Sequence, residues 1–281
     1  MDDHMTDWAA ALTYYGVLSI FPALLVVVSI LGMIGESATQ PLLDNLSALA
    51  PGSVTDIIEQ ALTNIEKSQG TAGLLFFVGL GIAIWTASGY IAAFTRAANA
   101  IWDVEEGRPI WKTLPLRIGL TVLMLILLVM TILAVLVTGP IADRVGGLIG
   151  LDDEALTVWN YGKWPFLVII VGLMFALLYY IAPNVQHPRF QWVSPGSIVA
   201  VITWIVASIA FGIYVSQFGS YNQTYGSLGA VIIFLVWLWI SNIAILLGGE
   251  LNAETERGRQ IDRGMPPERE PYLPPRDPPS D

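Results

Sequence analysis

The chain has no cysteine among its 281 residues and only two histidines, His4 and His187. The absence of cysteine excludes disulfide bonds, thiolate metal sites and a catalytic thiol. Neither histidine lies in a motif with the spacing of metal ligands, and no phosphate-binding glycine loop or dinucleotide fingerprint is present. We therefore expect no metal, no cofactor and no catalytic residue, and we expect that the protein is not an enzyme.

Charged residues are also scarce, at 13% of the chain, against roughly 25% in a soluble domain. No charge occurs between Arg189 and Glu250, an interval that is long enough for two membrane spans of about 20 residues each. The apolar runs are continuous and do not alternate as the strands of a membrane barrel would. The net charge of -10 gives no support for nucleic-acid binding. The composition predicts an all-α, polytopic membrane protein.

Six apolar runs predict six transmembrane helices in one membrane domain, residues 1–254. Asp2, Asp3 and Asp7 stand where a signal peptide would carry basic residues, so we expect that the first helix is a retained span. In the fifth span, Ser194 has the character of an N-cap and Pro195 that of a first helical residue. The predicted spans are about 8–34, 71–98, 113–137, 161–182, 195–218 and 227–249.

Two further segments lie outside the spans. Residues 36–70 include a short amphipathic helix in the first extracytoplasmic loop, with an acidic polar face that contains Asp56 and Glu59. That face favours packing on the rim of the bundle over gripping anionic lipid, and docking of a partner is the alternative. Residues 255–281 are rich in proline and charge, which predicts a disordered cytoplasmic tail.

The distribution of lysine and arginine predicts the orientation in the membrane. With six spans, one side carries only Lys67, Arg144 and Lys163. We therefore expect a multi-pass protein of the cytoplasmic membrane with both termini in the cytoplasm. The other ten basic residues share the predicted cytoplasmic side: Arg96, Arg108, Lys112, Arg117, Arg189, Arg257, Arg259, Arg263, Arg269 and Arg276.

Polar and aromatic residues within the spans form a candidate cavity or substrate path. Pro22 lies near the middle of the first span and should kink it, which can serve packing or line a cavity. Residues 220–229 combine two glycines, Gly226 and Gly229, with polar side chains, directly after Gly219, and are either an outer loop or part of a cavity mouth. The candidate residues are Tyr14, Tyr15, Ser19, Pro22, Trp85, Ser88, Tyr214 and Tyr225.

A second set of polar residues lies near the ends of the spans and is a candidate for fixing the helices to one another. Arg96 and Glu250 could form an ion pair, or each could reach water separately. On the sixth span, Ala244, Gly248 and Asn252 form a seam of small residues suited to close packing. The helix-fixing candidates are Arg96, Asn99, Asn184, Glu250 and Asn252.

Several motifs together resemble the YihY/BrkB family of bacterial inner-membrane proteins. They are Ala-Ala-Ala-Leu-Thr-Tyr-Tyr-Gly-Val-Leu-Ser-Ile-Phe-Pro (9–22), Ile-Trp-Thr-Ala-Ser-Gly (84–89), Ala-Ala-Asn-Ala-Ile-Trp-Asp-Val (97–104), Leu-Tyr-Tyr-Ile-Ala-Pro-Asn (178–184), Ser-Pro-Gly (194–196) and Tyr-Gly-Ser-Leu-Gly-Ala with Gly-Gly-Glu-Leu-Asn-Ala (225–253). The resemblance implies six helices in the cytoplasmic membrane and no settled biochemical activity. Members of the family have been linked to serum resistance and to lipid or envelope export, and an old ribonuclease BN label accompanies them.

Two functional classes remain open. A transporter or exporter of a lipid, envelope component or small solute is the first, with membrane lipid and such a substrate as partners and without nucleic acid. The spans contain no Asp, Glu or His in their middle, which argues against a proton relay. The second is a scaffolding protein of the envelope without transport activity. Intrinsic ribonuclease activity is disfavoured for lack of metal ligands, and the oligomeric state stays open.

Overall fold

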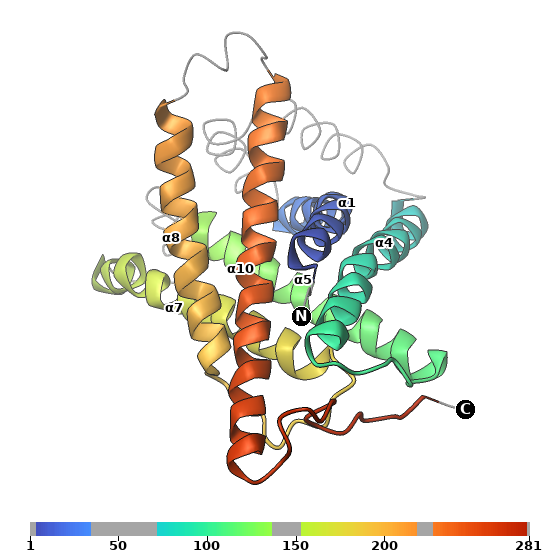
Figure 1. Cartoon of the computed structure of the whole chain (residues 1–281). Coiled ribbons are helices and arrows are strands. Elements are labelled where there is room, and N and C mark those ends of the chain that lie inside the picture. The colour runs from blue at the N-terminus through green and yellow to red at the C-terminus, as the bar shows by residue number, and fades with distance from the viewer. Residues whose placement is uncertain (1–3, 35–71, 137–152, 218–226, 280–281) are drawn as a thin grey trace. The chain divides into compact units, whose positions relative to one another are not determined.

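The structure is a computed structural model that describes residues 4–34, 72–136, 153–217 and 227–279, with the side chains of residues 20–34 and 72–79 outside the description. Its elements are six α-helices (Figure 1), as the sequence predicts for an all-α protein. Their bounds agree with the predicted spans to within a few residues, apart from an earlier start of the fourth and a later end of the sixth. They are α1 (Met5–Ile34), α4 (Ala72–Ile101), α5 (Ile110–Leu136), α7 (Asp153–Ile181), α8 (Pro195–Gln217) and α10 (Ser227–Asp262).

Four of these helices contain a segment that is long and apolar enough to cross a membrane. The segments are Ile110–Val135, Leu156–Ile181, Pro195–Ser216 and Val231–Asp262. Helices α1 and α4 are 30 residues long each, but their side chains are described only in part, so their spans stay predictions. The expected amphipathic helix within 36–70, the proline kink at Pro22 and most of the segment 220–229 lie outside the described residues or side chains.

The chain divides into two compact units, which we describe separately. The first comprises residues 1–18, 87–121 and 171–281, and the second comprises residues 19–86 and 122–170. In the second unit, the rings of Trp159 and Phe166 pack at 6.4 Å in α7. Lys163 is buried there, with its Nζ 5.8 Å from the ring centroid of Trp164. The sites discussed below belong to the first unit.

Helices α8 and α10 lie side by side in the first unit (Figure 1) because small residues meet where they cross. A Cβ added to Gly248 would lie 2.5 Å from the carbonyl oxygen of Gly196 and 2.7 Å from the Cβ of Ala200. Asn252 accepts a hydrogen bond from the backbone N–H of Gly196 (2.9 Å), and Ala244 is buried. The predicted seam of small residues on α10 is therefore the contact surface for α8.

Two tryptophans join the same helices further along. The indole N–H of Trp204 in α8 donates to the hydroxyl of Ser241 in α10, and that of Trp237 in α10 donates to Ser208 in α8, each at 3.1 Å. A buried indole needs an acceptor, and each helix supplies one to the other. These reciprocal bonds fix the register of α8 on α10.

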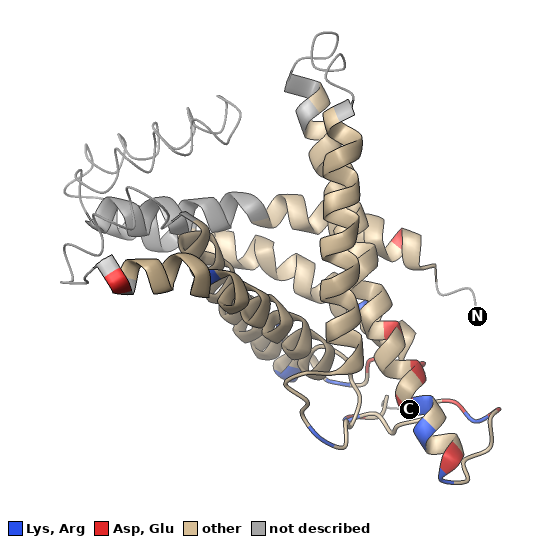
Figure 2. Ribbon diagram, turned by 90° about the vertical axis from the view of Figure 1, so that its left-hand side faces the viewer, with Lys and Arg blue, Asp and Glu red and all other residues tan. Residues whose placement is uncertain are grey.

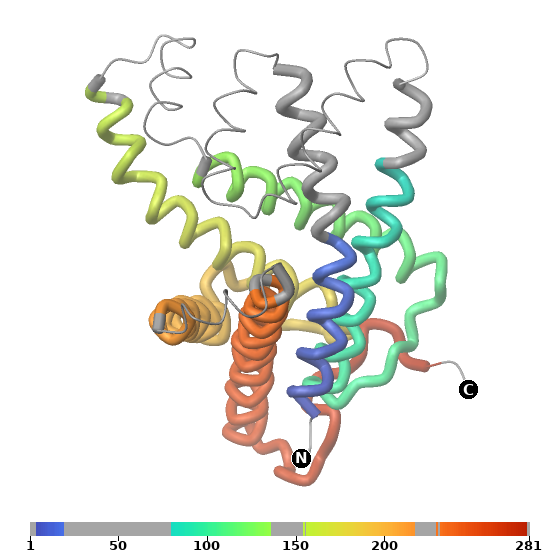
Figure 3. Tube along the Cα trace, turned by 90° about the horizontal axis from the view of Figure 1, so that it is seen from above, coloured from blue at the N-terminus to red at the C-terminus, as the bar shows by residue number. Residues whose placement is uncertain are grey.

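The first part of α1 packs against α4 and α10 (Figure 3), and a polar triad lies in this contact. The hydroxyl of Tyr90 donates to Asn242 Oδ1 (2.9 Å), and Asn242 Nδ2 donates to Thr13 Oγ1 (3.1 Å). The Thr13 hydroxyl in turn donates to the carbonyl of Ala9 (2.7 Å). Because these buried groups satisfy one another, we interpret the triad as a helix lock, not a binding site.

The C-terminal segment differs from the predicted disordered tail. Helix α10 continues to Asp262, where Arg257 pairs with Glu254 and Arg259 with Glu256 one turn apart. Figure 2 shows these charges in the last turns of α10. Beyond the helix, Leu273 is buried against Trp102, Val104, Val185 and Ala253. Composition missed this order because the segment folds on other parts of the chain and not by itself.

Candidate functional site

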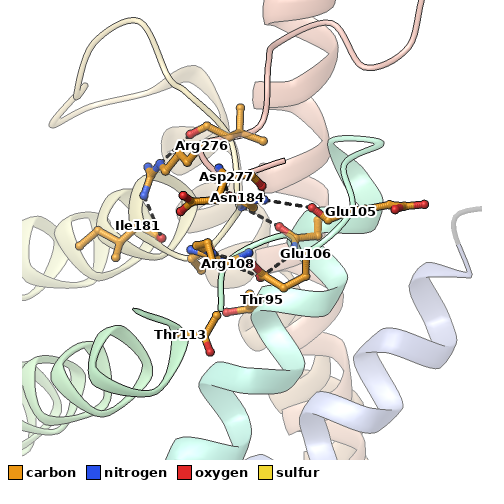
Figure 4. Close-up of polar contacts among 12 residues, drawn as sticks. Thr95, Glu105, Glu106, Arg108, Thr113, Ile181, Asn184, Arg276 and Asp277 are labelled. Atoms are coloured by element: carbon orange, nitrogen blue, oxygen red, sulfur yellow. Dashed lines mark hydrogen bonds and ion pairs between the residues drawn. The ribbon is translucent and has the colours of Figure 1, made fainter. Parts of the chain in front are cut away.

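Asn184 is the centre of a group of hydrogen bonds that joins three segments distant in the sequence, which we call the loop network (Figure 4). It is fully buried, its backbone N–H donates to Asn99 Oδ1 (2.7 Å), and its Nδ2 donates to the carbonyls of Glu105 (3.0 Å) and Asp277 (2.7 Å). The backbone N–H of Asp277 donates back to Asn184 Oδ1 (3.1 Å). The loop after α4, the loop after α7 and the C-terminal segment thus meet at one side chain.

An ion pair extends the loop network toward α5. Arg108 donates through Nε to Glu106 Oε1 (2.7 Å) and through Nη2 to Glu106 Oε2 (2.6 Å), and Nη2 also reaches the carbonyl of Ala182 (2.9 Å). Partial burial by itself would raise the pKa of Glu106, but the bonds from Arg108 and Asn99 outweigh it and lower that pKa below its usual range. Glu106 is therefore ionised at neutral pH and holds Arg108 in place.

Arg276 attaches the C-terminal segment to the end of α7. Its guanidinium donates to the carbonyls of Tyr180, Ile181 and Val185. The last carbonyls of a helix have no partner within the helix, so Arg276 acts as a side-chain cap for α7. A second ion pair, between Lys112 and Asp277 (2.6 Å), ties the segment to the start of α5.

A polar pocket lies beside the loop network, between the end of α7, the start of α8 and the last turns of α10. It is open on one side and has a volume of about 70 Å³. We call it the polar pocket, and its wall includes aromatic, polar and charged side chains. The lining residues are Trp102, Ala176, Tyr179, Tyr180, His187, Pro188, Arg189, Gln191, Ser194, Pro195, Asn252, Thr255, Glu256 and Arg259.

The rim of the pocket at α8 is rigid because it is a helix start with a complete cap. The backbone N–H of Ser197 donates to Ser194 Oγ and that of Ser194 to Ser197 Oγ, both at 3.0 Å. Asn252 of α10 donates to Ser194 Oγ as well (3.0 Å). The sequence correctly predicts Ser194 as the N-cap and Pro195 as the first helical residue.

The aromatic wall of the polar pocket surrounds His187. The His187 ring lies 4.9 Å from that of Trp102, edge to face, and 5.5 Å from that of Tyr180. Burial, assisted by the positive charge of Arg276, lowers the pKa of His187 from 6.5 to about 4. His187 is therefore neutral at physiological pH.

The acidic part of the pocket is a single buried carboxylate. Glu256 Oε2 accepts from Arg259 Nη1 (3.2 Å), and its Oε1 accepts from Gln260 Nε2 (2.8 Å). Both oxygens are thus occupied by neighbours on α10. Arg189, on the loop after α7, makes no hydrogen bond or ion pair with any residue that the structure describes.

The predicted cavity residues that the structure describes differ in their exposure. Tyr14, Trp85 and Tyr214 are exposed, at 62%, 58% and 59% respectively, as apolar surface that faces lipid would be. Tyr15 packs its ring on Gly89, where an added Cβ would lie 2.8 Å away. Ser88 is buried and accepts from Arg117 Nε (2.9 Å).

The remaining three cavity candidates are described only in part. Ser19 is partly buried, whereas the side chain of Pro22 and the whole of Tyr225 lie outside what the structure describes. The cavity therefore stays a prediction, and exposed aromatic residues in a span can face lipid as readily as a path.

The helix-fixing candidates separate into two groups. Asn99, Asn184 and Asn252 are brought into the hydrogen bonds described above. Arg96 is exposed on α4, and the ion pairs of the described residues do not join it to Glu250, which is partly buried on α10. The second alternative, in which each reaches water separately, fits the exposed Arg96, whereas Oε2 of Glu250 is buried.

Sequence reasoning missed the polar pocket. In the sequence, Arg189 and Arg259 served only as charges that predict the membrane orientation, and His187 only as an isolated histidine. The one local signal in the sequence for a binding site here was a group of aromatic residues around this loop, Tyr179, Tyr180 and Trp192. Among the described residues, no group of three or more His, Asp or Glu side chains could hold a metal ion.

Comparison with known proteins gives consistent relatives. The family described as Virulence factor BrkB matches residues 1–272. The ribonuclease-like protein YfkH of Bacillus subtilis (strain 168) is 32% identical over 264 residues, which cover 94% of this chain and 93% of YfkH. A UPF0761 membrane protein of Aromatoleum aromaticum is 30% identical over 93% of this chain, which spans only 63% of that relative.

A further UPF0761 membrane protein, from Pseudoalteromonas translucida, is 28% identical over 90% of this chain and 82% of its own length. No solved structure matches the chain. The family match and the membrane proteins among its relatives agree with the apolar helices and with the resemblance in the sequence. The chain belongs to the BrkB (YihY) family of bacterial membrane proteins.

Proposed function

We propose that the protein is a transporter or exporter, not an enzyme, that moves a lipid, an envelope component or a small solute across the bacterial cytoplasmic membrane. In this proposal it is a six-span protein with both termini in the cytoplasm. The observation that carries the proposal is the polar pocket, which opens at the end of apolar helices and combines charged, polar and aromatic side chains. Sites for small molecules have this mixture of apolar walls and a few placed polar groups.

The other buried polar groups differ from the pocket in that their hydrogen bonds are satisfied within the protein, which supports the pocket as the binding site. The triad of Thr13, Tyr90 and Asn242 is closed upon itself, and Asn184 uses its side-chain amide fully within the loop network. Arg189, in contrast, lines the pocket from an exposed position and makes no ion pair with a described residue. An unneutralised charge in a concave, partly aromatic wall favours a ligand.

RNA cleavage is a function that the name of YfkH suggests, and we do not extend it to this chain. His4 faces one carboxylate, Asp7, at the exposed start of α1 (3.7 Å). His187 is packed against Trp102 and Tyr180. Neither arrangement resembles the ligand cluster that metal-dependent hydrolysis of RNA uses.

Reconstitution into liposomes tests the proposal. The full chain should raise lipid scrambling or the flux of at least one solute in a broad panel above that of empty vesicles. Gln191→Trp places a large ring at the mouth of the pocket and should abolish this flux. Gly258→Trp is the matched control, because a Cβ added at Gly258 on α10, a position that does not line the pocket, would meet nothing within 4 Å.

A scaffolding role is the second candidate, and one observation favours it. The C-terminal segment is fixed to both neighbouring loops by Arg276, Asp277 and Leu273, which makes a rigid surface at the ends of the helices. Vesicles with no flux above background for any lipid or solute would contradict transport and support this role. Flux that both tryptophan variants retain would remove the polar pocket from the path.

A further inference from the structure

The charge of the polar pocket is positive at physiological pH. Two guanidinium groups, Arg189 and Arg259, and one carboxylate, Glu256, line it, which leaves one positive charge because His187 is neutral. A net positive charge in a partly enclosed wall attracts an anion.

The two arginines have free donors toward such an anion. Arg259 uses Nη1 for Glu256, and a guanidinium has five N–H donors, so most of its donors remain. Arg189 keeps all of its donors with respect to the described residues. Guanidinium groups bind phosphate in a two-pronged geometry that a lysine cannot reproduce.

The size of the pocket suits a phosphate group. A volume of about 70 Å³ holds several water-sized positions at about 15 Å³ each, so a phosphate group has room to enter. The neutral hydroxyls of Ser194 and Thr255 and the amide of Gln191 can complete the hydrogen bonds.

The surroundings suit a molecule with an apolar remainder. Helix α8 starts at the rim of the pocket, and its exposed side chains from there onward are apolar, namely Ile198, Val199 and Ile202. In a membrane this surface faces the acyl chains. A phosphate in the pocket could therefore belong to a lipid whose chains lie along α8, or to a free phosphate ester from the aqueous side.

We propose that the polar pocket is a binding site for a phosphate ester, held by Arg189 and Arg259. This inference deepens the proposed function, because it names the chemistry of the group that the same pocket would hold. The ligand's role as transported cargo rests on the proposed function. Binding of a phosphate ester itself requires no transport. The phosphate-site proposal and the transport proposal can therefore fail separately.

Thermal unfolding of the purified full chain in detergent tests the site. Titration with short-chain phosphatidylglycerol should raise the midpoint temperature in a saturable way, and short-chain diacylglycerol, which lacks the phosphate, should not. Arg189→Gln and Arg259→Gln should each weaken the binding by about tenfold, the effect of losing a charge-assisted hydrogen bond. Arg189→Lys should recover part of the loss, which shows that the variants fold.

The matched control is Arg263→Gln, an exposed arginine just after α10 that does not line the pocket. An equal loss of affinity in Arg263→Gln, or equal stabilisation by diacylglycerol, would overturn the proposal. A second arm uses glycerol 3-phosphate and inorganic phosphate. Binding of these with the same dependence on Arg189 identifies a soluble phosphate ester, whereas binding of the lipid alone identifies a headgroup.

The full chain and its arginine variants, reconstituted in liposomes, separate phosphate binding from transport. Phosphate binding that depends on both arginines, without flux of any tested solute or lipid, would leave the site in place and remove transport. Loss of specific phosphate binding together with flux that is unchanged in Arg189→Gln and Arg259→Gln would remove the phosphate site and leave transport in place.

Discussion

The side chain of Asn184 makes three hydrogen bonds within the loop network. Its amide satisfies two carbonyls and accepts one N–H, all within 3.1 Å, in a place with no access to water. An aspartate could not donate to the two carbonyls, and a glutamine is too long for the space. The amide of an asparagine is therefore required there.

Asn184→Ala should lower the free energy of unfolding by about 3 kcal/mol, since it leaves buried backbone groups of Glu105 and Asp277 without partners. Thermal unfolding in detergent measures the change. Gln186→Ala is the control in the same loop, because its amide also reaches the C-terminal segment but from an exposed position. Equal effects of the two substitutions would contradict the central role of Asn184.

His187 gives the protein a pH-dependent stability. Its pKa is about 4 in the folded chain and 6.5 when exposed, so between these values the unfolded state binds the proton more tightly. The neutral histidine therefore stabilises the fold fully above pH 6.5. This contribution is lost progressively as the pH falls from 6.5 to about 4, and it amounts to at most about 3 kcal/mol.

His187→Phe should remove that part of the pH dependence, which unfolding experiments between pH 4 and pH 8 can measure. Glu106 contributes separately, because its lowered pKa gives stability that is lost only at a lower pH, below the ordinary range of a glutamate. His4→Phe is the control, since His4 is exposed at the start of α1. A variant His187→Phe that keeps the full slope between pH 4 and pH 6.5 would contradict the assignment.

At the scale of elements, the crossing of α8 and α10 depends on the lack of side chains at Gly196 and Gly248. Backbone from each helix fills the space where the other would place a Cβ. Tyr179 closes the contact from α7 by donating to the carbonyl of Ile245 (2.6 Å). Close approach of backbones is a common way to associate helices in membranes, where lipid removes most of the hydrophobic driving force.

Gly248→Val should separate the two helices and lower the free energy of unfolding by about 2 kcal/mol, as expected for a residue too large for its space. Thermal unfolding of the purified protein checks it. Gly258→Ala on the same helix should be neutral or stabilising by up to about 1 kcal/mol, because the space is open and alanine favours a helix. A neutral Gly248→Val would contradict the close crossing.

At the scale of the whole molecule, the loop network constrains the topology. The segments that follow the second, fourth and sixth predicted spans share the bonds of Asn184, so they lie on one side of the first unit. The predicted six spans would place these three segments on the same side of the membrane. The excess of lysine and arginine in them predicts that this side is the cytoplasm.

Because the chain has no cysteine, single cysteines can report on this topology. In intact cells, Glu105→Cys and Gln186→Cys should resist an impermeant maleimide, and Thr157→Cys at the start of α7 should react. All three positions are exposed, so permeabilised cells should label each of them and serve as the control. Labelling of Gln186→Cys in intact cells would contradict the predicted orientation.

The sequence by itself determined the helical class of the protein and the limits of the described helices to within a few residues, apart from the start of α7 and the end of α10. The scarcity of charge and the long apolar runs require helices that satisfy their own backbone in lipid, and Ser194 with Pro195 marks a helix start through local bonds alone. The seam of small residues on α10 was likewise readable, because spacing of 4 residues places Ala244 and Gly248 on one face.

Only the tertiary structure decided what the polar residues do. Asn184, Arg276 and Asp277 lie up to 93 residues apart, and composition alone marked the last two as disordered. Arg189 and Arg259 share a pocket because the loop after α7 folds back on the last turns of α10. Bonds between distant segments depend on the packing of whole helices, and no local pattern of residues specifies them.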